Sequence, residues 1–181
     1  MRVISGTRRG RKLCEIEGMD IRPTTDRVKE SMFNLIQGMV AGCDVLDAFG
    51  GSGALGIEAL SRGAKSAVCV DRDEKSLAVA KKNYQMCDFS ADFVLQSANA
   101  YLEKTDKHFD IVFMDPPYNK GLVPPALEII KKRNLLNDGG IIVIERDSTE
   151  DKLSHNGYTL LKERKYGRTI ITILGMHQKE T

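Results

Sequence analysis

Short apolar runs alternate with helical patterns through most of the chain. Five of these runs, each bounded by charged or turn-forming residues, have the length and composition of buried strands. They open at Val45, Ser66, Asp92, Asp110 and Gly140. The stretches between them have helical character, as residues 54–62 illustrate. Strands that alternate with helices join as βαβ units, so this pattern predicts an α/β fold built on a parallel sheet.

The two ends of the chain depart from this alternation. Residues 157–164 and 169–174 are strand-like runs with a short polar connection, which predicts an antiparallel hairpin closing a seven-stranded, mostly parallel sheet. Residues 3–5 and 12–16 predict a second, N-terminal hairpin. A helix capped by Thr25 or Asp26 is expected to run to about Gln37. Its apolar face would comprise Val28, Met32, Leu35, Ile36 and Met39.

Composition agrees with one globular domain. A chain of 181 residues is long enough for a proper core, and we expect a single domain over 1–181, with an extension over 1–40 and a Rossmann-like core over 41–181. No apolar run approaches the length of a membrane span. The 4 cysteines form no C-x-x-C pair and the 3 histidines show no ligand spacing. We therefore expect no metal site and a reducing, cytoplasmic compartment.

A glycine-rich turn follows the first core strand. Gly51, Gly53 and Gly56 form a G-x-G-x-x-G between a strand that ends near Phe49 and a helix that starts at Ala54. Glycines in such a turn permit a tight bend and a close approach of the backbone to a ligand. The pattern recurs across nucleotide-binding folds and does not identify a ligand alone.

Two carboxylates narrow the choice of ligand. Asp47 lies at the end of the first strand, where it would repel a pyrophosphate and attract an ammonium group. Asp71, followed by Arg72, ends the second strand 20 residues after Gly51, where an acidic residue can bond a ribose. Each residue alone also fits a plain capping role. Together they favour S-adenosyl-L-methionine, which has a cationic amino-acid end and no phosphate, over NAD.

A third loop is a weaker part of the same predicted crevice. Ser97, Ala98 and Asn99 follow the apolar run over residues 93–95. At the end of that strand they would lie beside the adenine, where a side-chain oxygen of Ser97 or Asn99 can accept from the ring amine. A serine or asparagine that only begins a loop or helix has the same appearance. We expect an adenine contact here, with Phe49 of the glycine turn nearby.

The tetrapeptide Asp115-Pro116-Pro117-Tyr118 is the most informative motif of the chain. It follows the apolar run over residues 109–114, so it would emerge at the carboxyl end of a strand, where ligands bind in open α/β sheets. The Asp115 carboxylate and the Pro116 carbonyl are two hydrogen-bond acceptors, which suit an amine substrate. The ring of Tyr118 offers a face on which a planar base can stack. A proline turn without chemistry is the plainer interpretation.

Positive charge is unevenly placed although the net charge is only +2. Residues 1–12 contain five basic residues and no acidic one, and glycines at 6 and 10 favour a flexible arm. A basic arm can bind nucleic-acid phosphates. We therefore expect RNA contacts from Arg8, Arg9, Arg11, Lys12, Arg22 and Arg27. The alternative is a solvated polar terminus.

These motifs together resemble the RsmD-type family, bacterial S-adenosyl-L-methionine-dependent enzymes that methylate N2 of a guanine in 16S ribosomal RNA. The matching stretches are residues 1–6, 9–13, 22–31, 46–49, 53–64, 70–71 and 115–118. The resemblance implies a class I methyltransferase fold, the cofactor named above and the small ribosomal subunit as partner, and we expect a monomer. Two positions depart from the pattern: Gly50 stands where the family has alanine, and Ser97 where it has an acidic residue.

The residues leave other functions open. Related methyltransferases with a similar tetrapeptide act on adenine N6 or on protein glutamine, and a noncatalytic RNA-binding module is a reading from a different class. If the protein methylates the guanine amine, the two acceptors of the tetrapeptide hold the amine hydrogens and direct the nitrogen lone pair toward the methyl group of the cofactor. Asp115 can also take up the departing proton.

Overall fold

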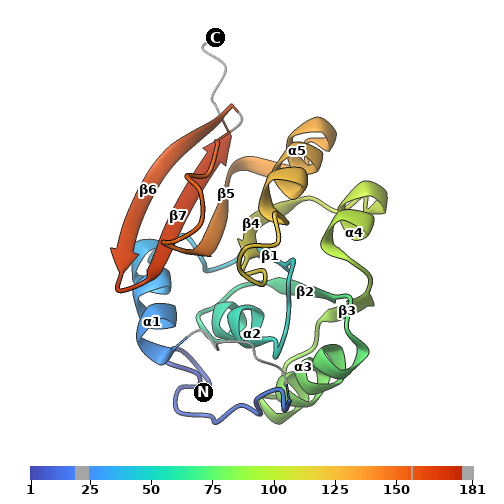
Figure 1. Ribbon diagram of the computed structural model, residues 1–181. Helices are drawn as coiled ribbons and strands as arrows, with labels where there is room; N and C mark the ends of the chain where they lie inside the picture. The colour runs from blue at the N-terminus through green and yellow to red at the C-terminus, as the bar shows by residue number, and fades with distance from the viewer. Residues whose placement is uncertain (19–24, 156, 177–181) are drawn as a thin grey trace.

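A seven-stranded sheet forms the centre of the protein (Figure 1). The computed structural model describes residues 1–18, 25–155 and 157–176. The strands lie in the order β3-β2-β1-β4-β5-β7-β6. Their bounds are β1 (Asp44–Asp47), β2 (Ser66–Asp71), β3 (Asp92–Leu95), β4 (Phe109–Met114), β5 (Leu136–Asp147), β6 (Tyr158–Tyr166) and β7 (Thr169–Met176). Strands β1 to β5 pair in parallel, and β7 is antiparallel to both β5 and β6, which confirms the predicted mixed sheet.

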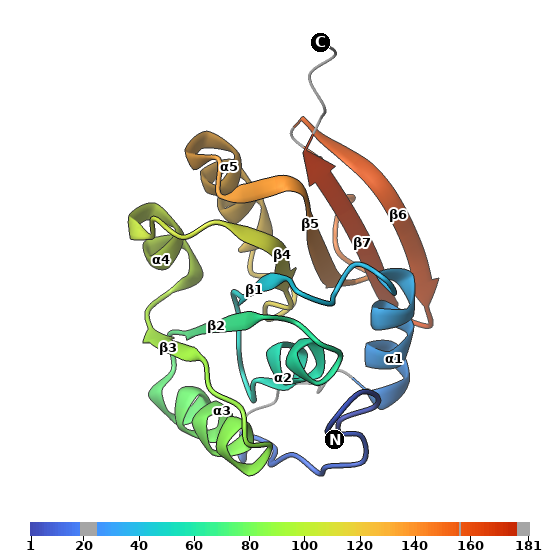
Figure 2. The ribbon, with the colours of Figure 1, turned by 180° about the vertical axis from the view of Figure 1, so that it is seen from behind.

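Helices cover both faces of this sheet (Figures 1 and 2). Those of the described residues are α1 (Asp26–Leu35), α2 (Ala54–Ser61), α3 (Glu74–Met86), α4 (Ala98–Lys104) and α5 (Val123–Arg133). Side chains alternate along a strand, so Val45 packs with residues of α1 and α2, whereas Leu46 packs with those of α4 and α5. Helix α3 lies on the same face as α2. None of the described helices combines the length and the hydrophobicity of a membrane span.

Several element boundaries differ from the sequence prediction. Helix α1 ends at Leu35, and Met39 is 41% exposed instead of lying on the buried face. Phe33 takes the buried position and packs against Phe113 with ring centroids 5.4 Å apart. Strand β5 begins at Leu136, before the predicted start at Gly140. A bulge in its pairing with β4 allows the strand to include the residues before Gly140.

The predicted N-terminal hairpin exists, but it is not a free arm. Arg2 pairs with Lys12, so the first limb lies closer to the N-terminus than residues 3–5. The amides of Ile4 and Ser5 instead donate to the two carboxylate oxygens of Glu58 at 2.9 and 3.1 Å. Gly6 sits against the Ser61 carbonyl, where a side chain would collide, so this glycine serves close packing rather than flexibility.

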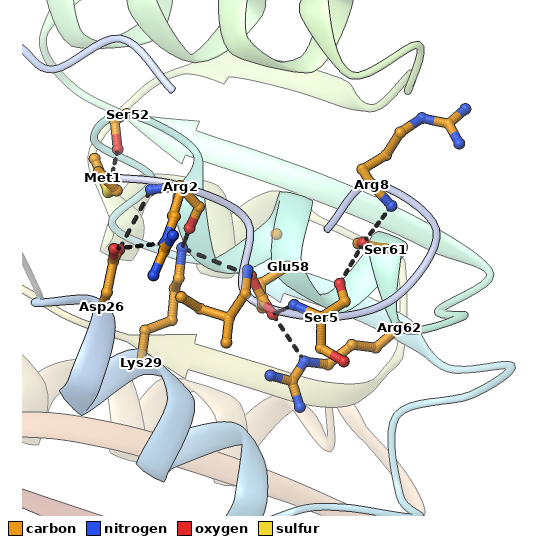
Figure 3. A network of polar contacts seen from close by, with 12 residues as sticks. Met1, Arg2, Ser5, Arg8, Asp26, Lys29, Ser52, Glu58, Ser61 and Arg62 are labelled. Carbon is orange, nitrogen blue, oxygen red and sulfur yellow. Dashed lines mark hydrogen bonds and ion pairs between the residues drawn. The ribbon is translucent and has the colours of Figure 1, made fainter. Parts of the chain in front are cut away.

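Glu58 is the centre of a buried ionic network (Figure 3). Its Oε2 atom lies 3.6 Å from Nζ of Lys29, and its Oε1 atom accepts from Nε of Arg62 at 2.9 Å. Lys29 and Glu58 are both fully buried, and Nζ of Lys29 also donates to the Arg2 carbonyl at 2.6 Å. Burial lowers the pKa of Lys29, and the neighbouring Glu58 opposes that shift. The network joins the hairpin, α1 and α2.

The side chain of Tyr84 on α3 packs closely against the glycine turn. Gly53 has φ +80°, a left-handed conformation that disfavours other residues, and a Cβ there would lie 2.8 Å from Cε2 of Tyr84. Gly56 is helical, yet a Cβ at this position would collide with the Tyr84 hydroxyl. Gly50 similarly lies against Sγ of Cys69, which leaves no room for the alanine that the family pattern has there. These glycines therefore make room for the protein's own side chains.

We predict that Lys29→Ala lowers the free energy of unfolding by about 3–5 kcal/mol, because it removes one partner of a buried charge pair. Urea denaturation with a common slope measures the change. Lys82→Ala, the same substitution at an exposed site on α3, serves as the control and should shift stability by no more than about 0.5 kcal/mol. Equal, small losses in the two variants would contradict a structural role for the network.

We predict that Gly56→Ala destabilises the protein by about 1–3 kcal/mol through overpacking and that Tyr84→Phe, which removes the colliding hydroxyl, recovers much of that loss. A double-mutant cycle in urea should give a favourable coupling between the two substitutions. Gly53→Ala is the control. Its left-handed backbone strain does not depend on the hydroxyl, so Tyr84→Phe should not rescue it. Additive effects at Gly56 would rule out the contact as the cause.

Candidate active site at the carboxyl edge of the sheet

Carboxylates from three neighbouring strands converge at the carboxyl edge of the sheet. Asp47 ends β1 opposite Cys69 of β2 on one side and Phe113 of β4 on the other. Asp71 and Asp115 are each two residues beyond those partners, so they lie on either side of the β1 end, further out along the strands. Adjacent strands are about 4.8 Å apart, which puts the two flanking strands roughly 10 Å from each other. A small molecule can lie across the end of β1 between them.

Asp47 is buried and incompletely bonded. Its Oδ2 atom accepts from the Gly56 amide at 3.3 Å, whereas its Oδ1 atom has no hydrogen-bond partner within the described part of the chain. The side chain is 1% exposed. Burial raises the pKa of Asp47 to about 7, the Gly56 hydrogen bond opposes this, and Asp71 adds to it. A buried carboxylate oxygen without a donor suits a cationic ligand group, so this residue fits the ammonium end of the predicted cofactor.

Asp71 braces the glycine turn and remains partly exposed. Its Oδ2 atom accepts from the Gly51 amide at 2.8 Å, and its Oδ1 atom accepts from the Asp73 amide at the same distance. The helix cap of α3 is Asp73, not Asp71. Arg72 is exposed beside it. Asp71 thus fixes the turn relative to β2 and stays partly exposed to solvent.

The loop after β3 is used for capping. Ser97 is the N-cap of α4 and accepts from the Ala100 amide at 3.2 Å, so one of the two lone pairs of its hydroxyl oxygen is already used. Ala98 is buried in the core and Asn99 is half-buried. Phe49, which follows β1, packs partly against the same core cluster as Ala98. An adenine contact in this loop stays a prediction.

The tetrapeptide emerges directly after β4 and is tied to the neighbouring strand. The Tyr118 hydroxyl donates to Oε1 of Glu145 at 3.1 Å, and burial raises the pKa of Tyr118, with Glu145 and Asp115 adding to the shift. The Asn119 amide, in a left-handed conformation, donates to Glu150 at 3.3 Å. Asp115 is partly exposed, Pro116 is buried and Pro117 is exposed. The loop is therefore held from the β5 side while a carboxylate and a ring stay accessible.

Glu145 is the site residue that sequence reasoning missed. It is 2% exposed near the carboxyl end of β5. The signal that could have found it is the one carried by Asp47: an acidic residue directly after a run of apolar residues, here 141–144. Glu145 orients the Tyr118 ring through the hydroxyl group.

The predicted RNA-contacting residues have different environments. Arg8 is bound to the fold, because its Nε atom donates to the Cys87 carbonyl at 2.7 Å and its guanidinium lies over the Phe89 ring at 5.1 Å. By contrast, the side chains of Arg9, Arg11, Lys12 and Arg27 are exposed. Arg22 lies outside the described residues. Within the described chain, no cluster of three or more His, Cys, Asp or Glu residues could hold a metal ion.

Comparison with known proteins places this geometry in context. The model of the family described as "Conserved hypothetical protein 95" matches residues 1–175. Ribosomal RNA small subunit methyltransferase D of Haemophilus influenzae is 37% identical over 172 residues, covering 92% of this chain and 89% of that protein. The Escherichia coli protein of the same name is 36% identical over 154 residues, covering 81% and 75%.

Solved structures share the whole architecture. The structure described as "Putative methyltransferase yhhF from Escherichia coli" superposes with a TM-score of 0.88 at 32% identity, covering 99% of both chains. The match thus includes the N-terminal hairpin and the C-terminal antiparallel strands as well as the core. The chain belongs to the RsmD-type methyltransferase family.

Proposed function

We propose that this protein transfers a methyl group from S-adenosyl-L-methionine to the exocyclic N2 amine of a guanine in 16S ribosomal RNA of the small ribosomal subunit. The observation that carries the proposal is the Asp115 tetrapeptide at the carboxyl end of β4, on the strand next to the buried Asp47. Membership of a family whose named relatives include small-subunit ribosomal RNA methyltransferases supports the substrate class.

The residues at the carboxyl edge of the sheet would bind different parts of the cofactor. Asp47 would hold the ammonium group of the cofactor, Asp71 its ribose, and the loop that begins at Ser97 its adenine. When bound, the cofactor supplies an activated methyl group on a sulfonium, so the reaction needs no metal. The rigid glycine turn keeps the two carboxylates in place, because it is bonded to Asp71 and Asp47 through the amides of Gly51 and Gly56.

The tetrapeptide would act on the target amine. An exocyclic amine on an aromatic ring is a poor nucleophile, because its lone pair is delocalised into the ring. Hydrogen bonds from the amine to the Asp115 carboxylate and the Pro116 carbonyl would localise that lone pair and direct it. Tyr118 would stack on the base, its ring orientation held by Glu145. The base has to leave its own stack, which favours a target in a loop or bulge. Asp115 would accept the departing proton or pass it to water.

A transfer assay with methyl-labelled S-adenosyl-L-methionine tests the proposal. Small ribosomal subunits from cells lacking this protein are offered beside naked 16S RNA, DNA and bulk protein, and labelled nucleosides are identified after digestion. Label in N2-methylguanosine is expected. Label in N6-methyladenine or in protein glutamine would replace the substrate and keep the enzyme class. Cofactor binding measured by calorimetry separates an enzyme with another substrate from a noncatalytic RNA-binding module.

In the same assay we predict that Asp115→Ala loses at least about a hundredfold in turnover, through lost proton acceptance and positioning of the amine. Cofactor affinity should be unchanged, because the proposal assigns this residue to the target amine and not to the cofactor. Asp73→Ala, which removes the nearby cap of α3, is a carboxylate control that should retain turnover if the protein stays folded. Turnover close to wild type in Asp115→Ala would remove this mechanism.

We predict that cofactor affinity rises with pH between about 5.5 and 7 because of Asp47. Its pKa of about 7 leaves the carboxyl protonated below that pH, and a cationic ligand favours the ionised form. Binding should therefore release a proton, with affinity increasing by up to tenfold per pH unit well below the pKa. Calorimetry in buffers of different ionisation enthalpy measures the released proton. Asp47→Asn should abolish this pH dependence, and an unchanged dependence in that variant would exclude Asp47 as its origin.

A further inference from the structure

The turn between β6 and β7 lies at the same edge of the sheet as the candidate active site. Asp147, the last residue of β5, pairs with Thr169 of β7, which in turn pairs with Tyr166 of β6. Because β5 runs parallel to β4, the connection through Gly167 and Arg168 projects from the carboxyl edge. Gly167 has φ +59°, as a tight hairpin turn allows. Figures 1 and 2 both show the joined ends of β6 and β7 beside α1.

This hairpin is strongly basic. Residues 158–176 contain Lys162, Arg164, Lys165 and Arg168 against Glu163 alone, so their net charge is +3, while the whole chain carries only +2. Glu163 is already engaged, because its Oε2 atom accepts from the Thr172 hydroxyl and lies 3.7 Å from Arg146. Arg164 and Lys165 are exposed, and neither has an acidic partner within the described residues.

The same hairpin is built into the wall of the site. Nη2 of Arg168 lies 3.5 Å from the buried carboxylate of Asp147, and the Arg168 carbonyl accepts from the Ser148 amide at 2.7 Å. Two residues earlier on β5, Glu145 holds the Tyr118 hydroxyl. On β5, Asp147 at the basic tip is thus two residues from Glu145, which bonds the ring that would stack on the target base.

The tip of the predicted RNA arm, around Arg8, lies at the other edge of the sheet. The Arg8 amide donates to Ser61, the last residue of α2, and its side chain binds Cys87 at the end of α3. Helices between parallel strands run antiparallel to them, so these helix ends lie at the amino edge. Arg8 is therefore about 12 Å from the glycine turn, the length of the eight-residue α2, whereas the base of the arm reaches that turn through the contact between Met1 and Ser52. The Arg8 end of the arm is remote from the end of β4, where the target base would bind.

We infer that the β6–β7 tip, formed by Arg164, Lys165 and Arg168, binds the RNA phosphates that flank the target nucleotide. The inference rests on the proposed RNA substrate. Side chains alternate along β6, so Arg164 lies on the face of Tyr166 and α1 and Lys165 on the opposite face, and the tip presents charge to both sides. Lysines on edge strands also prevent sheet-to-sheet association. Lys162, further along β6, is not counted with the tip, because its Nζ atom is bonded to the Leu35 carbonyl.

The test compares two double variants of equal charge change. Arg164→Gln/Lys165→Gln removes two of the three tip charges and leaves Arg168, which pairs with a buried carboxylate. Lys104→Gln/Lys132→Gln removes two exposed charges from the last turns of α4 and α5, at the amino edge. Methyl transfer to isolated small ribosomal subunits is measured at several salt concentrations, together with cofactor affinity.

For the tip variant we expect KM for the subunit to rise about tenfold or more at roughly 0.15 M salt, with kcat at saturation within twofold of wild type and cofactor affinity unchanged. The log–log dependence of affinity on salt should become shallower by about 1.4, from two lost phosphate contacts on single-stranded RNA. The amino-edge variant should match wild type. A tip variant that also matches wild type, or that loses only kcat, would overturn the inference alone. Wild-type protein that labels no RNA would overturn the proposed function and this inference with it.

Discussion

The Glu58 carboxylate holds together three segments that are far apart in the sequence. It accepts hydrogen bonds from two amides of the N-terminal hairpin and from Arg62, the C-cap of its own helix. It also faces the buried ammonium group of Lys29 on α1. A carboxylate with this burial has to keep all of its partners, because an unpaired buried charge costs several kcal/mol. The network therefore fixes the position of α2, whose N-terminus carries the glycine turn. The site at the carboxyl edge depends on this arrangement, although none of the network residues lies in it.

The glycine turn shows how a ligand motif can have an internal cause. A G-x-G-x-x-G is usually explained by the approach of a ligand, but Gly53 and Gly56 here leave space for the Tyr84 ring and hydroxyl. The same packing brings the Gly56 amide to Asp47. The turn packs against Tyr84 and is hydrogen-bonded to Asp71. It is therefore preorganised, and cofactor binding does not have to order it.

Much of the fold could be predicted because burial imposes a period on the sequence. The strands were predictable from apolar runs and the C-terminal hairpin from its short polar connection. Lys29 and Glu58 were not predictable as buried, since a charged residue on a helix usually reaches solvent and only the tertiary partners reveal otherwise. The prediction of a flexible N-terminal arm was wrong for a related reason. The glycine at position 6 serves contact with the Ser61 carbonyl, and a glycine that is needed for close packing looks in the sequence like one that is needed for mobility. The acidic residues at the ends of β1, β2 and β4 could be predicted because a glycine turn, a loop or a proline motif follows each apolar run. Glu145 also follows an apolar run, but it lies within β5 and no such motif marks it as part of a ligand site.

The hydrogen bond between Tyr118 and Glu145 connects the loop after β4 with strand β5. Tyr118 belongs to the β4 loop that would receive the base, whereas Glu145 belongs to β5, the strand on which the basic hairpin is assembled. Asp147 pairs with Thr169 and lies 3.5 Å from Arg168, so the hairpin tip and Glu145 are joined through the pairing of β5 with β7. RNA bound at the tip would therefore be presented in a fixed relation to the stacking surface. In the proposed reaction, such a fixed geometry would let the protein recognise its target by the shape of the surrounding RNA, which is how proteins commonly distinguish structured RNA.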